Sequence, residues 1–104
     1  MGKIVETATG GQFSELCEKF IAGDLAAHVF ARRFQELWDE KFDDISDWES
    51  ETYLEDLILP VSLYESNPAI YEAEKDNGLR NDDELLSEVR KYFGEYQAAK
   101  TEVA

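Results

Sequence analysis

The sequence predicts an all-α protein, an antiparallel four-helix bundle whose third helix is kinked or broken at Pro60. Four separate stretches carry apolar residues at the spacing i, i+3, i+4, i+7, which places them on one face of a helix. No stretch alternates apolar and polar residues for long enough to predict a β-sheet. Because short links join the four helices, we expect neighbours to pack antiparallel. The bundle should span residues 12–97, with residues 1–11 as a flexible N-terminal arm and 98–104 as a frayed C-terminal tail.

The first predicted helix has the clearest apolar stripe. It consists of Phe13, Leu16, Cys17, Phe20 and Ile21. Gly23 is suited to end this helix, since glycine readily adopts the left-handed conformation of a helix C-cap. Cys17 is the only cysteine, so it forms no internal disulfide. Its place on the stripe indicates a buried small apolar side chain rather than a reactive thiol.

The second predicted helix begins after Asp24, whose side chain can cap the free backbone N–H groups. Its apolar side is formed by Phe30, Phe34, Leu37 and Trp38. His28 is the only histidine and has no cysteine or second histidine with which to share a metal. We therefore expect His28 in a solvated or edge position.

The third predicted helix has Ser50 as its N-cap, which places acids near the positive helix end. Its stripe consists of Leu54, Leu57, Ile58, Val61 and Tyr64. Pro60 removes the N–H that would bond to the carbonyl of Asp56, so a kink or an end is expected there. Asn67 and Pro68 then close the segment.

The last predicted helix follows a turn at Asp76-Asn77-Gly78 and is capped by Asn81 or Asp82. Its stripe consists of Leu85, Leu86, Val89, Tyr92, Phe93 and Tyr96. Gly94 weakens the helix by about 1 kcal/mol relative to alanine, so we expect fraying beyond Gln97.

The overall charge restricts the possible partners. Asp and Glu number 24 and Lys and Arg number 10, which gives a formal net charge of −14 at pH 7. Contacts to phosphates need clustered cations, so direct binding to nucleic acid or to an anionic membrane is disfavoured. No apolar run approaches the ~18 residues that a membrane span needs, and residues 1–11 lack the apolar stretch of a signal peptide. We expect a cytoplasmic protein that is monomeric when free.

The patterns of known catalytic and metal sites are missing from the sequence. No acidic segment has the oxygen, glycine and glutamate positions of an EF-hand loop, and no Glu-x-x-His pair suits a di-iron bundle. No phosphate loop, Gly-x-Ser-x-Gly or Cys-x-x-Cys occurs. We therefore predict a protein that is not an enzyme, with no catalytic residues, no metal site and no cofactor.

The strongest functional signal is the acidic stretch from Glu36 to Asp56, which holds ten acids against the single base Lys41. Acids at this density create a directed negative field that speeds encounter with a cationic partner. Three aromatic residues, Phe42, Trp48 and Tyr53, interleave with the acids. Such residues can anchor an interface, although we expect at least two of the three in the core.

The chain resembles the colicin D-type immunity proteins, small acidic helical inhibitors of bacterial toxin nucleases. The resemblance lies in Phe13-Ser-Glu-Leu-Cys-Glu-Lys-Phe-Ile-Ala-Gly-Asp-Leu25 with Phe30 and Arg32-Arg33, in Leu57-Ile-Leu59 with Tyr64-Glu65, and in Tyr71-Glu-Ala-Glu-Lys-Asp-Asn-Gly-Leu79 with Leu85-Leu-Ser-Glu-Val-Arg-Lys-Tyr-Phe93. It implies a four-helix bundle in the cytoplasm of a bacterium. It also implies a 1:1 complex with a transfer-RNA-cleaving ribonuclease, whose basic cleft the acids enter in place of RNA phosphates.

This chain departs from that family in one place. The family has its contact acids at the end of the third helix and just after it, where only Glu65 is acidic here. We therefore expect the contacts to have shifted toward the acidic stretch, and a contact-dependent inhibition system fits as well as a colicin. The predicted toxin-binding residues are Asp43, Asp44, Asp47, Trp48, Glu49, Glu51, Tyr64 and Glu65.

Two other functions remain open at the level of sequence. One is a nucleic-acid mimic that inhibits another nucleic-acid-binding protein and shares the same electrostatics. The other is an acidic helical adaptor subunit whose charge serves solubility. Broad competition across unrelated nucleic-acid proteins would favour the first. Binding that is insensitive to salt would favour the second.

Overall fold

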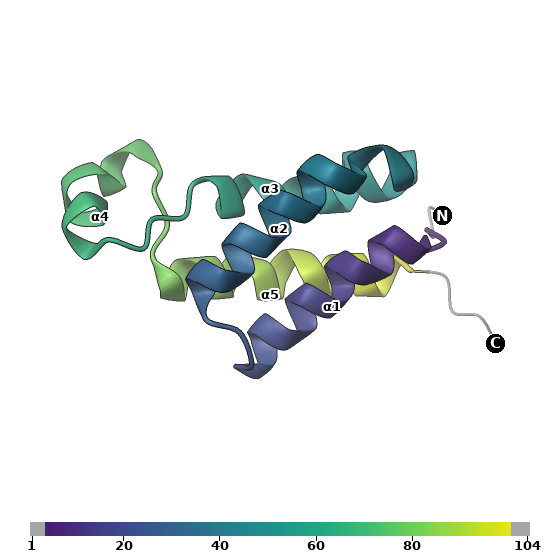
Figure 1. The fold of residues 1–104 in the computed structure, drawn as a ribbon, viewed down its shortest axis with the longest axis horizontal. Coiled ribbons are helices and arrows are strands. Elements are labelled where there is room, and N and C mark those ends of the chain that lie inside the picture. The colour runs from purple at the N-terminus through teal and green to yellow at the C-terminus, as the bar shows by residue number, and fades with distance from the viewer. Residues whose placement is uncertain (1–3, 101–104) are drawn as a thin grey trace.

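The computed structural model describes residues 4–100, and most of these residues lie in helices (Figure 1). The α-helices are α1 (Ala8–Ala22), α2 (Ala27–Lys41), α3 (Glu55–Ser62), α4 (Pro68–Glu74) and α5 (Asp82–Ala99). Two short 3-10 helices, η1 (Phe42–Asp44) and η3 (Lys75–Asn77), and a π-helix, η2 (Glu49–Leu54), complete the order. The all-α prediction is confirmed.

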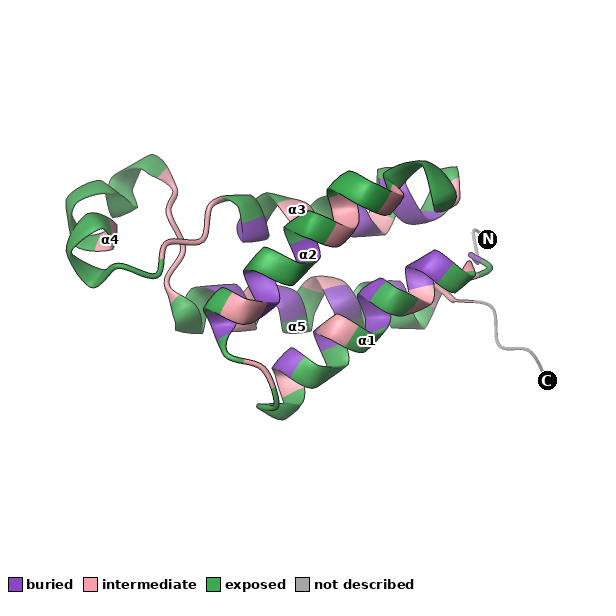
Figure 2. Ribbon diagram, viewed as in Figure 1, coloured by how far each residue is buried: buried purple, intermediate pink, exposed green. Residues whose placement is uncertain are grey.

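Four of the helices share one core, and the fifth does not. In cyclic order α1, α2, α3 and α5 each pack against the next, and η2 extends α3 against α5. The described residues extend 47 × 25 × 24 Å, with α4 at one end of the long axis (Figure 1). Figure 2 shows buried residues on the inner faces of the packed helices, whereas α4 has no buried residue. The structure therefore has five α-helices, and the prediction of a four-helix bundle, which did not include α4, is not confirmed.

The N-terminal segment packs on the bundle, which corrects the prediction of a flexible arm for residues 4–11. Ile4 is almost fully buried, and its N–H donates to the carbonyl of Ala99 at 2.8 Å. Thr7 caps α1 by accepting from the N–H of Gly10 at 2.9 Å. Within the predicted frayed tail, residues 98 and 99 end α5, and its C-cap Lys100 pairs with Ile4 of this segment. Residues 1–3 and 101–104 lie outside the described residues.

The connection between α1 and α2 confirms one predicted cap and corrects another. Gly23 ends α1 with φ +87°, the left-handed conformation that favours glycine. Asp24 is not the N-cap of α2; its N–H donates to the carbonyl of Lys19, so Asp24 belongs to the turn that ends α1. The helix starts after Ala26, which makes no side-chain capping bond. His28 is exposed, as predicted.

The third helical segment starts earlier than predicted and continues past Pro60. The N–H of Glu49 donates to Ser46 Oγ at 3.2 Å, and the N–H of Ser46 donates to Glu49 Oε1 at 3.3 Å. This reciprocal pair is a capping box, so Ser46 replaces Ser50 as the cap. Ser50 is buried, and its hydroxyl donates to the carbonyl of Asp47. Pro60 lies inside α3, which ends two residues later at Ser62, so a break at Pro60 is not confirmed.

Asn67 and Pro68 start a helix instead of only closing a segment. Asn67 Oδ1 accepts from the N–H groups of the two residues after Pro68, which itself occupies the first helical turn of α4. The chain then turns at Gly78, where φ is +98°, as the sequence predicts. Backbone hydrogen bonds of 2.9 Å link Arg80 to Leu63 and to Glu65. They join the two ends of residues 66–79, which contain α4 and η3 and which we call the α4 excursion. Of the two predicted caps of α5, Asn81 and Asp82, the structure has Asn81 as the N-cap.

The buried position of Cys17 generates a first testable prediction. Its side chain is fully buried, and this burial, together with the nearby charge of Glu18, raises the pKa of the Cys17 thiol. Because the thiolate is the reactive form, we expect alkylation of the native protein to be slow and limited by unfolding. Mass spectrometry after timed alkylation across a urea series measures this rate. Rapid labelling in the absence of urea would contradict the described core.

Candidate interaction surface

Exposed acids dominate the region that connects α2 to α3. Between Glu36 and Asp56, nine of the ten acidic residues are exposed, and Glu49 is the exception. The base Lys41 is half-buried. Phe42 and Trp48 lie in the same region and are 44% and 56% exposed. We define the α2–η2 surface as Asp39, Glu40, Phe42, Asp43, Asp44, Asp47, Trp48 and Glu51.

Several of these acids oppose the electrostatics of the helix that carries them. Asp39 and Glu40 lie in the last turn of α2, and Asp43 and Asp44 follow directly in η1. The C-terminal end of a helix carries partial negative charge, so an acid there costs about 0.3–1 kcal/mol at low ionic strength. Glu36 by comparison is paired with Arg32 at 3.6 Å. The acids at the end of α2 are therefore not explained by helix stability.

The aromatic residues of this region divide between the core and the surface. Trp38 packs edge-on to the buried Phe13, with ring centroids 6.0 Å apart. The exposed ring of Phe42 packs against Trp38, with ring centroids 5.0 Å apart. Trp48 borders a shallow hollow of about 210 Å³ together with Asp47 and Glu51. Two of the three interleaved aromatics are thus exposed, which corrects the expectation that two would be in the core. An exposed tryptophan beside carboxylates is suited to anchor a partner.

Tyr64 and Glu65 are separated from the other predicted contact residues. They follow α3 at the base of the α4 excursion, whereas η1 and η2 lie toward the opposite end of the long axis (Figure 1). The hydroxyl of Tyr64 donates to Asp82, and the burial of the side chain, followed by this bond, raises the pKa of Tyr64. The predicted contact set therefore does not form one surface.

A second acidic group surrounds Glu65. A hollow of about 340 Å³ lies between α4 and the start of α5. The acids that line it are Glu65, Glu72, Asp82 and Asp83. Three of these come from α4 and α5, so their proximity to Glu65 is not visible in the sequence. Asp82 and Asp83 also have a structural role, since acids stabilise the first turn of a helix.

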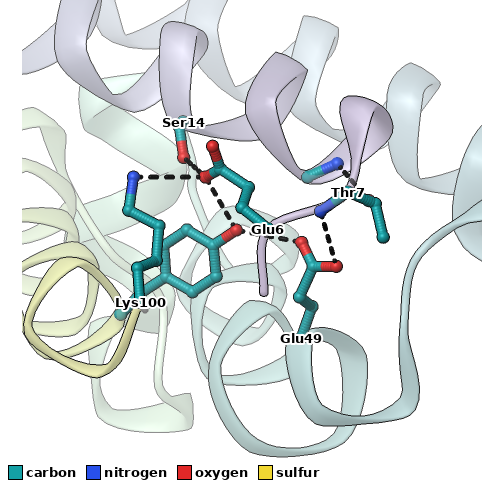
Figure 3. Close-up of polar contacts among 7 residues, drawn as sticks. Glu6, Thr7, Ser14, Glu49 and Lys100 are labelled. Atoms are coloured by element: carbon teal, nitrogen blue, oxygen red, sulfur yellow. Dashed lines mark hydrogen bonds and ion pairs between the residues drawn. The ribbon is translucent and has the colours of Figure 1, made fainter. Parts of the chain in front are cut away.

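Glu49 is fully buried, which removes it from the predicted contact residues. Its Oε1 accepts from the N–H of Thr7 at 3.1 Å and from the hydroxyl of Ser46 at 2.9 Å. Its Oε2 lies 3.0 Å from the hydroxyl of Tyr96 (Figure 3). The spacing Ser46-x-x-Glu49 is that of a capping box and could have indicated the helix start, but it does not indicate that the side chain of Glu49 is buried.

Glu6 lies on the other side of the Tyr96 hydroxyl, at 2.9 Å from it (Figure 3). Its Oε2 also accepts from Ser14 Oγ at 2.5 Å and from Lys100 Nζ at 3.3 Å. Burial raises the pKa of Glu6, but these bonds and the charge of Lys100 outweigh burial, and the net shift is downward. Glu6 therefore stabilises the fold above its unfolded-state pKa, and this contribution is lost as the pH falls through the folded-state value.

The α1 backbone approaches the Glu49 carboxylate so closely that only glycine fits at position 10. A Cβ atom on Gly10 would lie 1.7 Å from Glu49 Oε2 and 3.0 Å from the hydroxyl oxygen of Tyr96. Gly94 is exposed on α5 and has open space around it. The two glycines therefore differ in what an added methyl group would meet.

Within residues 4–100, no group of three or more His, Cys, Asp or Glu side chains is arranged to hold a metal ion. In the same range, no helix is long and apolar enough to cross a membrane. The features that stand out are the α2–η2 surface and the acidic hollow.

Substitution of the two glycines tests the close approach to Glu49. We expect Gly10→Ala to lower the free energy of unfolding by about 1–3 kcal/mol, because the methyl group displaces the Glu49 carboxylate. The control Gly94→Ala should raise it by about 0.5–1 kcal/mol, because alanine is the better helix former. Urea unfolding followed by circular dichroism compares the two. Equal stability of both variants would disprove the tight contact.

Neutralising the acids at the end of α2 tests whether they oppose stability. We expect Asp39→Asn with Glu40→Gln to raise the free energy of unfolding by about 0.3–1 kcal/mol per site at low ionic strength. The control Asp83→Asn, in the first turn of α5, should lower it by a similar amount. Thermal unfolding at low and high salt measures both effects, which should shrink as salt is added. A stability loss in the α2 variant would show that these acids serve the fold.

Comparison with protein-family models, with curated proteins and with solved structures gave no significant match. The resemblance to the colicin D-type immunity proteins therefore stays a prediction from short sequence motifs. The remaining arguments for function come from the exposed acids and aromatic residues of the α2–η2 surface.

Proposed function

We propose that this protein is a cytoplasmic immunity protein that neutralises a bacterial nuclease toxin, a transfer-RNA-cleaving ribonuclease, by covering its basic active-site cleft in a 1:1 complex. The observation that carries the proposal is the set of exposed acids at the end of α2, Asp39, Glu40, Asp43 and Asp44. They oppose the helix dipole and add to a net charge of −14. Acids that reduce stability are typical of a surface retained for binding.

The α2–η2 surface has the chemistry that a basic cleft requires. Its carboxylates attract a cationic partner over distance and accelerate the encounter. At contact, a carboxylate facing Lys or Arg forms short charge-assisted hydrogen bonds. Trp48, more than half exposed, supplies an apolar anchor among these carboxylates. A partner bound in this way cannot at the same time admit the phosphates of RNA.

The acidic hollow is the competing contact site. It contains Glu65, the one acid at the position where the resembled family has its contact acids. The α2–η2 surface is favoured because it combines more acids with exposed aromatic residues, and because helix stability does not explain its acids. The two sites lie far enough apart in the fold to be altered independently (Figure 1).

Three sets of four neutralising substitutions test the proposal with equal changes in charge. The surface set is Asp43→Asn, Asp44→Asn, Asp47→Asn and Glu51→Gln. The hollow set is Glu65→Gln, Glu72→Gln, Asp82→Asn and Asp83→Asn. The control set, exposed elsewhere, is Glu18→Gln, Glu74→Gln, Asp76→Asn and Glu95→Gln. The measurements are growth of cells that co-express the nuclease domain encoded beside the protein, and the association rate at several salt concentrations.

We expect the surface set to abolish protection and to slow association at least about tenfold at low salt, while helicity is retained. The control set should protect like the wild type. Full protection by the surface set, with loss of protection by the hollow set, would place the contact at the hollow and refute the α2–η2 surface. Inhibition of several unrelated nucleic-acid-binding proteins would indicate the mimic instead, and salt-independent binding would indicate the adaptor.

A further inference from the structure

We propose that the hollow beside Trp48 binds an arginine side chain of the partner, with the guanidinium group against the indole ring and paired with the carboxylates of Asp47 and Glu51. The inference rests on the proposed function in one respect, since it takes the partner to be a basic protein. It goes further because it names the chemical group that is bound and the side chains of the α2–η2 surface that bind it.

The hollow has the size and the lining of a site for one cationic side chain. Its volume is about 210 Å³, and it is lined by Asp47, Trp48, Glu51 and Thr52. Pockets that bind drug-sized molecules have volumes of about 300–1,000 Å³, so this hollow suits a single side chain. All four lining residues are exposed. A partner can therefore reach the indole and both carboxylates from solvent.

The groups that attract a cation here are not engaged by the protein itself. In the part of the chain that the structure describes, no Lys or Arg lies within 4.0 Å of the carboxylates of Asp47 or Glu51. The cation–π contacts of these same residues involve the rings of Tyr92 and Tyr96, not that of Trp48. An indole is the aromatic ring that binds cations most strongly, and carboxylates add charge-assisted hydrogen bonds. The hollow therefore lacks only the cation.

The backbone beneath the hollow is fixed by buried polar groups. Glu49 and Ser50, which lie between Trp48 and Glu51 in the sequence, are both buried. The Glu49 carboxyl group joins this turn to the N-terminal segment and to α5 through hydrogen bonds of 3.1 and 3.0 Å. The hydroxyl of Ser50 donates to the carbonyl of Asp47 at 3.3 Å. A site held in this way loses less conformational entropy on binding than a site on a free loop.

The chemistry of the hollow favours arginine over lysine. A guanidinium group is planar, so it can lie against an aromatic ring while its N–H groups donate to carboxylates. It is also more weakly hydrated than the ammonium group of lysine, so less water has to be removed when it meets the indole. We therefore expect a preference for arginine of about two- to fivefold in affinity, which corresponds to the strength of one exposed cation–π contact.

The test titrates the full chain with two end-blocked peptides, tetra-arginine and tetra-lysine, at low salt. The measurement is ¹H–¹⁵N NMR of the indole N–H groups, with the Trp48 resonance assigned from its absence in Trp48→Leu. We expect the arginine peptide to bind more tightly by about two- to fivefold and to shift the Trp48 resonance. Equal affinities, or a Trp48 resonance that does not move up to millimolar arginine peptide, would overturn the proposal.

A pair of aromatic variants separates the hollow from the rest of the α2–η2 surface. Trp48→Leu should remove the preference for arginine and keep the general attraction of basic peptides, because the charge is unchanged. The control is Phe42→Leu, at a residue that is exposed on the same surface but does not line the hollow, and it should keep the preference. A preference for arginine that persists in Trp48→Leu would show that the indole does not bind the guanidinium group.

A pair of charge variants tests the carboxylates. Asp47→Asn with Glu51→Gln should also remove the preference for arginine. The control, Asp43→Asn with Asp44→Asn, makes the same change in charge outside the hollow and should weaken both peptides equally. The same loss of preference in both double variants would refute a specific role for the two lining acids.

The peptide titration needs no toxin, so this inference and the proposed function can fail separately. Protection of cells against the nuclease domain together with equal peptide affinities would refute the arginine site and retain the immunity function. A preference for arginine that depends on Trp48, in a protein that gives no protection, would retain the site and refute the immunity function.

Discussion

The carboxyl group of Glu49 joins three parts of the chain that are far apart in sequence. Its own backbone and Ser46 form the capping box that starts the third helical segment. Its side chain continues inward to the N–H of Thr7, before α1, and to the hydroxyl of Tyr96, on α5. Gly10 permits the approach, because no other side chain fits against the carboxyl group. The position of the turn between α2 and η2 depends on this one buried polar group.

The charges of the protein favour the helix dipoles at several helix ends and oppose the dipole at the end of α2. Arrangements that stabilise helices do occur, such as the pair of Arg32 with Glu36 and the acids in the first turn of α5. The end of α2 shows the opposite arrangement, with acids where the helix dipole disfavours them. A surface of this kind reduces a folding free energy that is already small for a domain of 104 residues. The cost makes sense if a partner of opposite charge compensates it on binding.

Local patterns predicted some elements well and failed where distant contacts decide. The stripe ending at Gly23 and a helix cap at Asn81 or Asp82 depend on neighbouring residues and agree with the structure, where Asn81 is the cap. The burial of Ile4 depends on Ala99 at the other end of the chain, so no local pattern shows it. At the surface, the exposure of the acids agrees with the prediction, but the exposure of Trp48 and the burial of Glu49 could be known only from the fold. Adjacent in sequence, one faces solvent and the other the interior.

The α4 excursion leaves and rejoins the bundle at nearly one point, where Arg80 bonds to Leu63 and Glu65. Because it contributes no buried residue, its sequence is free of the packing constraints that govern the other helices. Such a segment can diverge, lengthen or be exchanged between homologues at little thermodynamic penalty. Unlike the helices that face the interior, this protrusion can therefore change in sequence without any rearrangement of the packed core.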